Sequence, residues 1–433
     1  MKLNEVFLNR MKSLLKDDFN AFLESLNNSI VKAIYVNENK IDVETFKKIV
    51  DFKIEPIYYD KAGFYVDSEK KGRHALHHAG AFYMQEPSAM FTVNSIQFRG
   101  DEKVLDMCAA PGGKTIQIAN RIPNGILVSN EIVKSRSEIL FSNVERMGLD
   151  NVIITNENSK NIAEAYANSF DVCFVDAPCS GEGMFRRGSE VQQQWNENLD
   201  EMCAARQLEI LSNADKALVK NGILVYSTCT YSPKENEEVV REFLKTHNYK
   251  LVNIPYNHSK GINMPEAVRL YPHENRGEGQ FVAVMQKLSE NGFCSYSQAK
   301  LNNSSITTDF MKSNFGITGD MVEYKNNSYL IKIRDMIKKN INYVSIGVRL
   351  GNVKDKRFEP AHNLFTALGD KIANKLCLNF DDEFAKKYLR GETFDVDLSD
   401  GYGAVLFNGC AVGGFKISKG KMKNYYPKGL RNF

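Results

Sequence analysis

Two cysteines stand in polar, turn-forming surroundings directly after strand-like runs of the sequence. Cys179 lies in the stretch DAPCSGEG (176–183), and Cys229 lies in the stretch STCTYS (227–232). A buried structural thiol is the usual fate of a cysteine. In a turn beside a ligand site, however, a thiolate can be exposed and activated. Cys179 and Cys229 are therefore candidates for nucleophilic chemistry.

The other cysteines carry no comparable signal. The chain has eight cysteines, with no CxxC pair and no histidine near the two candidates. This spacing argues against a disulfide framework, a zinc site or a redox motif and is typical of proteins in a reducing cytosol. We expect no bound metal, and we expect packed thiols at the remaining positions, which are Cys108, Cys173, Cys203, Cys294, Cys377 and Cys410.

The stretch VLDMCAAPGGKT (104–115) predicts a strand that enters a turn of small residues and then a helix. Small residues allow a ligand to approach the backbone closely, and the helix N-terminus favours a carboxylate or a phosphate. The stretch has neither the GxxxxGK[ST] pattern of a Walker loop nor the GxGxxG dinucleotide fingerprint. The ligand is therefore expected to be neither a plain nucleoside triphosphate nor NAD.

A single acid, Glu131, follows the next strand-like run, ILVSN (126–130). In nucleotide-binding folds an acid at this place accepts hydrogen bonds from the ribose of an adenosine-bearing cofactor. A lone glutamate is more often a surface acid, so the assignment depends on its place after the strand.

These residues need a scaffold that brings them together, and the sequence from about 100 to 287 predicts one. Five apolar strand runs (VLDMC, ILVSN, VIIT, DVCFVD and ILVYSTC) alternate with helical stretches at 133–147, 201–219 and 234–246. Such alternation is typical of a doubly wound parallel sheet, which binds ligands beyond the carboxyl ends of its strands. The candidate residues lie at those ends.

The flanking regions have a different character. Residues 1–26 read as amphipathic helices, and residues 32–66 hold short strand pieces that predict a small α+β module ending near residue 80. Residues 289–310 are polar and rich in Ser and Asn, as in a linker. Two basic stretches follow: 332–357 has eight Lys or Arg against two Asp, and 411–433 has six against no acid.

Composition limits the classes of function. The chain has 433 residues, enough for two or three domains, and 56 Lys plus Arg against 53 Asp plus Glu. Net charge therefore does not indicate a nucleic-acid-binding protein, but the two basic stretches are interleaved with aromatic residues, as on surfaces that pair with phosphates and stack on bases. We expect no signal peptide and no membrane span, and hence a cytoplasmic protein.

The motifs resemble a known family. Residues 106–115, DAPCSGEG and STCTYSPKENE match the hallmark motifs of the Nop/Sun RNA cytosine-5 methyltransferases. Four further stretches resemble the bacterial RsmF-type branch, whose members methylate 16S rRNA of the small subunit and carry a PUA-like C-terminal domain. They are HHAGAFYMQEPSAM (77–90), RLYPHENRGEGQFVAV (269–284), RLGNVKDKRFEPAHNL (349–364) and KNYYPKGLR (423–431). The resemblance covers nearly the whole chain.

The resemblance implies transfer of a methyl group from S-adenosyl-methionine to carbon 5 of a cytosine in RNA. Carbon 5 is a poor nucleophile, so a thiolate must first add at carbon 6. By resemblance Cys229 is that nucleophile, and Cys179 assists breakdown of the adduct and product release. Asp176 and Lys114 match active-site positions that bind the base and stabilise its developing charge.

The same resemblance implies a set of cofactor-binding residues. The methionine part is expected against the loop, the ribose on Glu131, and the adenosyl part near Arg136 and Asn158. The full set is Cys108, Ala109, Ala110, Pro111, Gly112, Gly113, Lys114, Glu131, Arg136, Asn158 and Asp176. Relatives often have Asp where this chain has Asn158, whose side-chain carbonyl can still accept a hydrogen bond. Tyr35-Val36-Asn37 also departs from an Arg-x-Asn pair of the family.

We therefore expect a Rossmann-like (class I) α/β methyltransferase core with two added RNA-binding units. The predicted division is 1–80 for an α+β module, 81–288 for the methyltransferase domain, 289–320 for a linker and 321–433 for a basic, β-rich PUA-like domain. The expected partner is small-subunit rRNA or the 30S subunit, with no DNA, no membrane and a monomeric chain.

Two alternatives remain open. The same chemistry on tRNA is one, and an rRNA-binding assembly factor with incidental catalysis is the other. A DNA cytosine-5 methyltransferase is disfavoured because it is expected to lack a cysteine at the position of Cys229.

Overall fold

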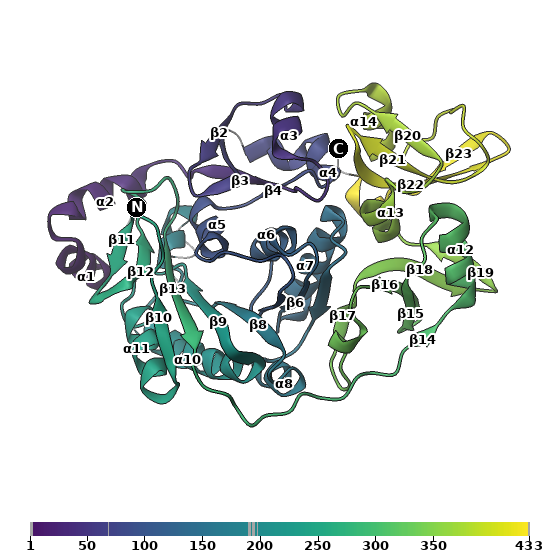
Figure 1. Cartoon of the computed structure of the whole chain (residues 1–433). Helices are drawn as coiled ribbons and strands as arrows, with labels where there is room; N and C mark the ends of the chain where they lie inside the picture. Colours follow the sequence, from purple (N-terminus) through teal and green to yellow (C-terminus); the bar gives the residue numbers. More distant parts are fainter. Residues whose placement is uncertain (1–2, 68, 189–191, 193–194, 197, 432–433) are drawn as a thin grey trace.

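The computed structural model describes residues 3–431 except 68, 189–191, 193–194 and 197. Residues 1–2 of the predicted N-terminal module and residues 432–433 of the predicted C-terminal domain therefore lie outside the described residues. Figure 1 shows a central sheet flanked by helices, a smaller unit above it and two further sheets beside it. The expected α/β core, with helices on both faces of a largely parallel sheet and an added unit at each end, is confirmed.

The N-terminal unit is an antiparallel sheet of order β2-β3-β1-β4 with helices around it. The strand pieces predicted within 32–66 are β1, β2 and β3, and the fourth strand comes from beyond residue 80. The elements are α1 (Glu5–Leu15), α2 (Phe19–Asn27), β1 (Lys32–Val36), α3 (Val43–Ile49), β2 (Ile54–Ile57), β3 (Asp60–Val66), α4 (Ala75–His78) and β4 (Phe82–Met84).

The central sheet has the order β11-β12-β13-β9-β8-β5-β6-β7-β17, and β10 also pairs with β13. Strands β5 to β9 are parallel, and β13 runs antiparallel beside β9. The strands are β5 (Lys103–Asp106), β6 (Ile126–Asn130), β7 (Val152–Thr155), β8 (Phe170–Asp176), β9 (Leu218–Thr228), β10 (Tyr249–Val252), β11 (Ser259–Gly261), β12 (Met264–Leu270) and β13 (Gln280–Lys287).

Helices cover both faces of this sheet, which explains why its strands are continuous apolar runs. In β5, Val104 packs into the core under α6 and α7, whereas its neighbour Leu105 packs into the core of the opposite face. The helices are α5 (Pro87–Asn94), α6 (Gly113–Arg121) and α7 (Lys134–Met147) on one face, and α8 (Ser159–Ala165), α10 (Leu199–Ala217) and α11 (Glu237–Thr246) on the other (Figure 1).

After β13 the chain crosses to the opposite edge of the molecule and forms two more sheets. The predicted linker 289–320 contains a helix, α12, whose residues Met311 and Phe315 are buried. The first sheet is β14-β15-β16-β18-β19 and the second is β20-β21-β22-β23. The elements are β14 (Asn302–Asn303), α12 (Ser305–Phe315), β15 (Asp320–Tyr324), β16 (Asn327–Ile331), β17 (Tyr343–Ser345), β18 (Val348–Lys354), β19 (Arg357–Pro360), α13 (His362–Leu368), β20 (Lys375–Leu378), α14 (Glu383–Arg390), β21 (Gly401–Phe407), β22 (Cys410–Ser418) and β23 (Lys421–Asn424).

One strand of the C-terminal region belongs to the central sheet. Strand β17 pairs antiparallel with β7 at the sheet edge. The Tyr343 hydroxyl lies 2.9 Å from the hydroxyl of Tyr166, and both rings are buried. The C-terminal region is therefore joined to the edge of the central sheet through this strand.

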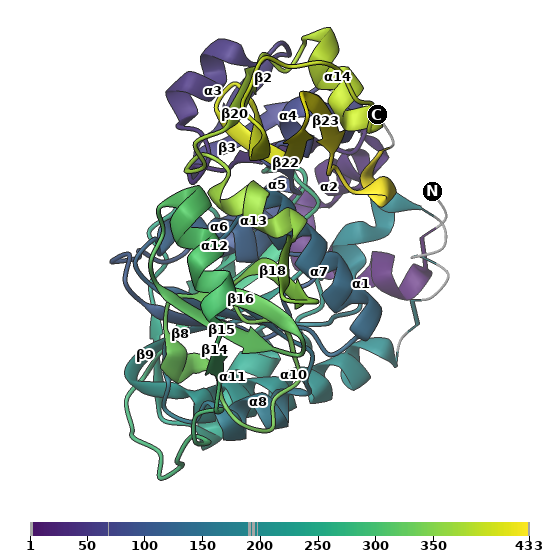
Figure 2. The ribbon, with the colours of Figure 1, turned by 90° about the vertical axis from the view of Figure 1, so that its right-hand side faces the viewer.

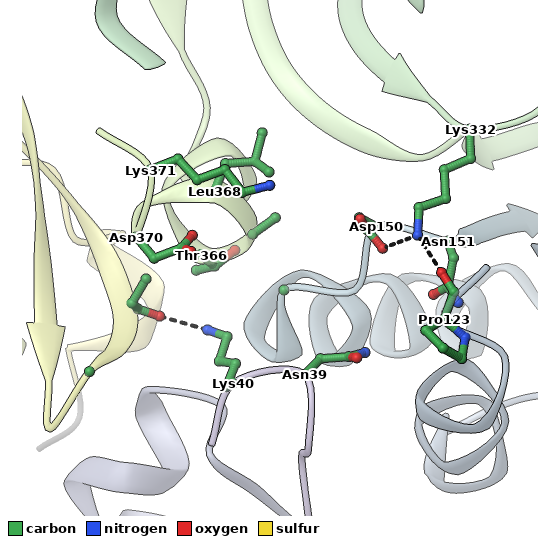
Figure 3. Close-up of a pocket in the computed structure, with 14 residues that line it drawn as sticks. Asn39, Lys40, Pro123, Asp150, Asn151, Lys332, Thr366, Leu368, Asp370 and Lys371 are labelled. Carbon is green, nitrogen blue, oxygen red and sulfur yellow. Dashed lines mark hydrogen bonds and ion pairs between the residues drawn. The ribbon is translucent and has the colours of Figure 1, made fainter. Parts of the chain in front are cut away.

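The N-terminal and C-terminal units also touch each other (Figure 2). His78 Nδ1 lies 2.8 Å from the Tyr426 hydroxyl, and the His74 and Phe380 rings pack 4.8 Å apart. A cavity of about 330 Å³ lies where both units meet the central domain, and Lys40 reaches across it to the carbonyl oxygen of Ala411 (Figure 3).

Within the described ranges, no helix is both long enough and apolar enough to cross a membrane.

Candidate active site

A cavity of about 300 Å³ opens at the carboxyl ends of β5, β8 and β9. It is lined by residues of the loop after β5, by the ends of β8 and β9, and by the segment 83–86. From the predicted set it brings together Cys108, Ala109, Ala110, Pro111, Gly113, Lys114, Asp176 and Cys229. This is the edge at which the alternating pattern predicted the ligand site.

The loop after β5 needs glycine where it turns into α6. Gly112 is the N-cap of α6 and has a φ of 115°, a left-handed conformation that L side chains rarely adopt. A Cβ at this position would lie 3.0 Å from Leu140 Cδ1. The turn exposes the first backbone N–H groups of α6, which favour a negatively charged ligand group.

Asp106, at the end of β5, is a residue of the cavity that sequence reasoning missed. Its carboxyl is fully buried; Oδ2 accepts a hydrogen bond from Thr115 Oγ1 at 3.1 Å, whereas Oδ1 has no protein partner. Burial, followed by the nearby charge of Asp176, raises the pKa of Asp106 to about 7. A buried carboxyl oxygen without a partner suits a ligand that carries a positive charge or an N–H donor.

Lys114 and Asp176 form an ion pair within the cavity. Lys114 Nζ donates to Asp176 Oδ2 at 2.7 Å. Asp176 Oδ1 accepts from Ser227 Oγ at 2.6 Å and from Gln280 Nε2 at 3.2 Å. Because three donors hold this carboxylate, its orientation is fixed before any ligand arrives. Gln280 was not singled out by the sequence.

The two candidate cysteines lie side by side. Their Sγ atoms are 3.3 Å apart, and both thiols are free and partly buried. The hydrogen bond to Cys229, followed by burial, raises the pKa of Cys179 well above its ordinary value. Cys179 therefore keeps its proton, which it can share with the sulfur of Cys229. Cys229 lines the cavity, whereas Cys179 is not among its lining residues.

Glu235 anchors the loop that carries Cys179. It accepts hydrogen bonds from Ser180 N at 2.9 Å and from Gln207 Nε2 at 3.0 Å, and Ser180 Oγ also donates to it. Burial raises the pKa of Glu235 to about 7. Its place in the STCTYSPKENE stretch is the only sequence signal that could have identified it.

The cavity lining does not include Glu131, Arg136 or Asn158, which we expected around the adenosine part of the cofactor. Glu131 is buried and forms an ion pair with Arg136 at 3.2 Å, and Arg136 Nη2 donates to the carbonyl oxygen of Ala110 at 2.8 Å. Asn158 is exposed and caps α8, because its Oδ1 accepts from Asn161 N at 2.8 Å. Its side-chain carbonyl, which we expected to accept from a cofactor, is thus already engaged.

Within the described part of the chain, no group of three or more His, Cys, Asp and Glu is arranged to hold a metal ion.

Three family models match consecutive parts of the chain. Residues 3–87 match the N-terminal domain of 16S rRNA methyltransferase RsmF, residues 93–286 match 16S rRNA methyltransferase RsmB/F, and residues 375–432 match the methyltransferase RsmF PUA domain. The PUA match is thus confined to the second C-terminal sheet and its surroundings.

Curated relatives match over nearly their whole length. Ribosomal RNA small subunit methyltransferase F of Vibrio vulnificus is 28% identical over 466 residues, covering 99% of this chain and 97% of the relative. The protein of the same name from an Enterobacter species is 29% identical, with coverages of 98% and 95%.

Solved structures match about two thirds of the chain. A methyltransferase homolog protein from Pyrococcus horikoshii has a TM-score of 0.60 at 28% identity and covers 66% of this chain and 95% of its own. NSun6 from the same organism, solved with the ligand SFG, has a TM-score of 0.59 at 22% identity, with coverages of 66% and 99%. The second match shows the fold alone.

Proposed function

Because the chain belongs to the RsmB/F family of 16S rRNA methyltransferases, which use S-adenosyl-methionine, we propose that it methylates carbon 5 of a cytosine in small-subunit rRNA. The observation that carries this proposal is the cysteine pair: Cys179 and Cys229 lie 3.3 Å apart beside the cavity that also holds the Lys114–Asp176 ion pair.

The residues of the cavity fit the cofactor. The unpartnered Oδ1 of Asp106 suits its ammonium group, and the N-terminus of α6 suits its carboxylate. Glu131 can accept hydrogen bonds from the ribose once its ion pair with Arg136 opens. When bound, S-adenosyl-methionine supplies an electrophilic methyl group. In this proposal Cys108 to Lys114, Glu131, Arg136, Asp176 and Asn158 remain the binding set, with Asn158 limited by its role as helix cap.

Cys229 forms the covalent bond to the base. Its thiolate adds to carbon 6, and the electron pair of the 5,6 double bond moves toward carbon 5, which becomes nucleophilic. Once carbon 5 carries the new methyl group, it must lose its proton, and the electrons of that C–H bond restore the double bond while the sulfur–carbon 6 bond breaks. Cys179, which keeps its proton, is placed to donate it to the departing sulfur of Cys229, and the proton lost from carbon 5 then restores the Cys179 thiol.

Lys114 and Asp176 orient the cytosine. In this proposal the Asp176 carboxylate accepts a hydrogen bond from the exocyclic amine of the base, or from N3 once N3 carries a proton, and the Lys114 ammonium stabilises charge that develops on the ring. The ion pair of 2.7 Å, together with the bonds from Ser227 and Gln280, keeps both groups preorganised.

The flanking units are proposed to hold the RNA. A base within a helix hides carbon 6, so the cytosine must be unpaired or flipped into the cavity. Basic and aromatic residues of the C-terminal region suit RNA backbone and unstacked bases. We retain the division into 1–80, 81–288, 289–320 and 321–433, a monomeric state and action on small-subunit rRNA or the 30S subunit as parts of the proposal.

The proposal is tested by transfer of a labelled methyl group, followed by digestion of the RNA to nucleosides. The substrates are 16S rRNA, 30S subunits and tRNA. We expect label in 5-methylcytidine with a small-subunit substrate and none with Cys229→Ala, while Cys294→Ala, which changes an exposed cysteine, remains active. Label in a different nucleoside would refute the chemistry, and label only in tRNA would refute the substrate.

A further inference from the structure

Glu182 is a buried carboxylate next to both cysteine-bearing loops. It lies three residues after Cys179, and its side chain has no exposed surface. The surroundings are an apolar cluster that includes Phe7, Phe22 and Trp195. A carboxylate in such a place requires a compensating cation and hydrogen-bond donors.

Glu182 ties the loop after Cys179 to the loop after Cys229. Its Oε2 accepts from the backbone N–H of Tyr231 at 3.1 Å, and its Oε1 accepts from Trp195 Nε1 at 3.0 Å. The next residue continues the link, because Gly183 N donates to the carbonyl oxygen of Cys229 at 2.9 Å. A Cβ on Gly183 would lie only 2.8 Å from that oxygen. The contacts of residues 182–183 therefore hold the two thiol-bearing loops together on one side, as the bonds between Ser180 and Glu235 do on the other.

The positive charge that compensates Glu182 comes from the N-terminal helix α1. Arg10, in helix α1, donates from Nη2 to Glu182 Oε1, and its Nη1 lies 3.5 Å from Asp200 Oδ2. Its guanidinium also lies over the rings of Phe7 and Trp195, at 5.7 and 5.8 Å from their centroids. Among the residues that the structure describes, Arg10 is the only Lys or Arg in an ion pair with Glu182.

We propose that Arg10 is a positioning residue of the methyltransferase: through Glu182 it holds the Cys179 loop against the Cys229 loop, so that helix α1 is part of the catalytic architecture. This inference rests on the proposed function only for its kinetic consequence. Its structural consequence, the closeness of the two thiols, can be measured without RNA.

The first test measures the thiol pair in the full-length protein without cofactor or RNA. Diamide takes two protons and two electrons from a pair of thiols, so that one S–S bond forms and the N=N bond of diamide is reduced. At 3.3 Å the sulfurs need only a small approach to reach the bond length of about 2.05 Å. Formation of the Cys179–Cys229 disulfide is measured by peptide mapping. We expect it to be rapid in the wild type and at least about tenfold slower in Arg10→Met.

The second test separates positioning from RNA binding. Arg10→Met is expected to lower kcat by roughly 10- to 100-fold, since small misplacements of catalytic groups have effects of this size, while KM for RNA changes less than about twofold. Arg10→Lys should recover part of kcat. The double variant Arg10→Met/Glu182→Gln should be more active than Arg10→Met, because the second substitution removes the buried negative charge that Arg10 otherwise compensates. Lys245→Met, which removes an exposed ion pair with Glu242 on α11, is the matched control.

The outcomes distinguish this inference from the proposed function. If the wild type makes no 5-methylcytidine but Arg10→Met still slows disulfide formation, the proposed function fails and the structural link survives. If Arg10→Met folds, oxidises at the wild-type rate and keeps its kcat, the inference is wrong. It is equally wrong if the variant raises KM alone. If Arg10→Met does not fold, Arg10→Lys and the double variant provide the same two comparisons.

Discussion

At residue scale, Asp106 has the most unusual environment in the cavity. Its carboxyl is buried, one of its oxygens has no partner, and its pKa is raised to about 7 by burial and then by the charge of Asp176. Around pH 7 the free protein is therefore divided between the neutral acid and the carboxylate. A ligand with an ammonium group binds the carboxylate form better.

Binding of S-adenosyl-methionine should consequently release a proton from Asp106. Below pH 7 the proton must leave before the ammonium group can bind well, so affinity should rise as pH increases from 6 to 7, by up to about tenfold per unit. The measurement is titration calorimetry in buffers of different ionisation enthalpy. Asp106→Asn should bind more weakly and without this pH dependence. A wild-type dissociation constant that is constant between pH 6 and 7 would contradict the assignment.

Some site residues could be predicted from the sequence, and others could not. Cys179, Cys229, Lys114 and Asp176 lie in short motifs after predicted strands, so their convergence at one sheet edge follows from the parallel pattern. The pairing of Arg10 with Glu182 joins residues 172 positions apart through tertiary packing alone. No local pattern encodes such a contact.

At the scale of elements, the turn that begins α6 depends on its glycine. Gly112 has a φ of 115°, and Leu140 Cδ1 leaves little room for a Cβ. Gly112→Ala should destabilise the fold by about 1–2 kcal/mol through backbone strain. It should also weaken cofactor binding, because the first N–H groups of α6 would be misdirected.

Thermal unfolding and cofactor titration test this prediction together. Gly292→Ala is the matched control, because a Cβ there meets nothing within 4 Å and its backbone is unstrained. An unchanged melting temperature and an unchanged affinity in Gly112→Ala would show that the loop adapts without glycine.

Strands that are buried on both faces could be predicted from the sequence, whereas short or edge elements could not. Strands β5 to β9 could be predicted because both of their faces are covered, which demands continuous apolar runs. Strand β17 has only three residues, and its partner β7 lies far away in sequence, so no local signal identifies it. Helix α12 lies inside the Ser- and Asn-rich segment that resembled a linker. It is capped by Ser304 and held by Met311 and Phe315 against residues that come later in the chain.

At the scale of the whole molecule, Lys40 joins three parts of the chain. Its ammonium group donates to the carbonyl oxygens of Ala79 at 2.8 Å, Arg146 at 3.4 Å and Ala411 at 2.6 Å. These residues belong to the N-terminal unit, helix α7 and strand β22 (Figure 3 shows the contact with Ala411). Burial lowers the pKa of Lys40 to about 8, so the three-way contact is complete below that pH.

Lys40→Met should loosen all three segments at once. Hydrogen bonds to a charged group contribute about 1.5–3 kcal/mol, so local hydrogen exchange should rise by roughly tenfold or more around residues 79–81, 146–148 and 410–412. Lys371→Met, which removes an exposed lysine from the rim of the same cavity, should leave all three unchanged. Faster exchange around residue 411 alone would show that Lys40 does not couple the units. In the wild type, raising the pH above 8 should begin to weaken the same contacts.

The proposed methyl transfer depends on Cys229 as the nucleophile, and the covalent adduct tests this role most directly. Cys179→Ala is incubated with S-adenosyl-methionine and the small-subunit substrate, separated on a denaturing gel and digested for mass spectrometry. We predict a stable protein–RNA adduct, with a methylated cytidine attached to the peptide that contains Cys229, and no adduct in Cys179→Ala/Cys229→Ala. An adduct at any other residue, or methyl transfer that survives Cys229→Ala, would contradict the mechanism.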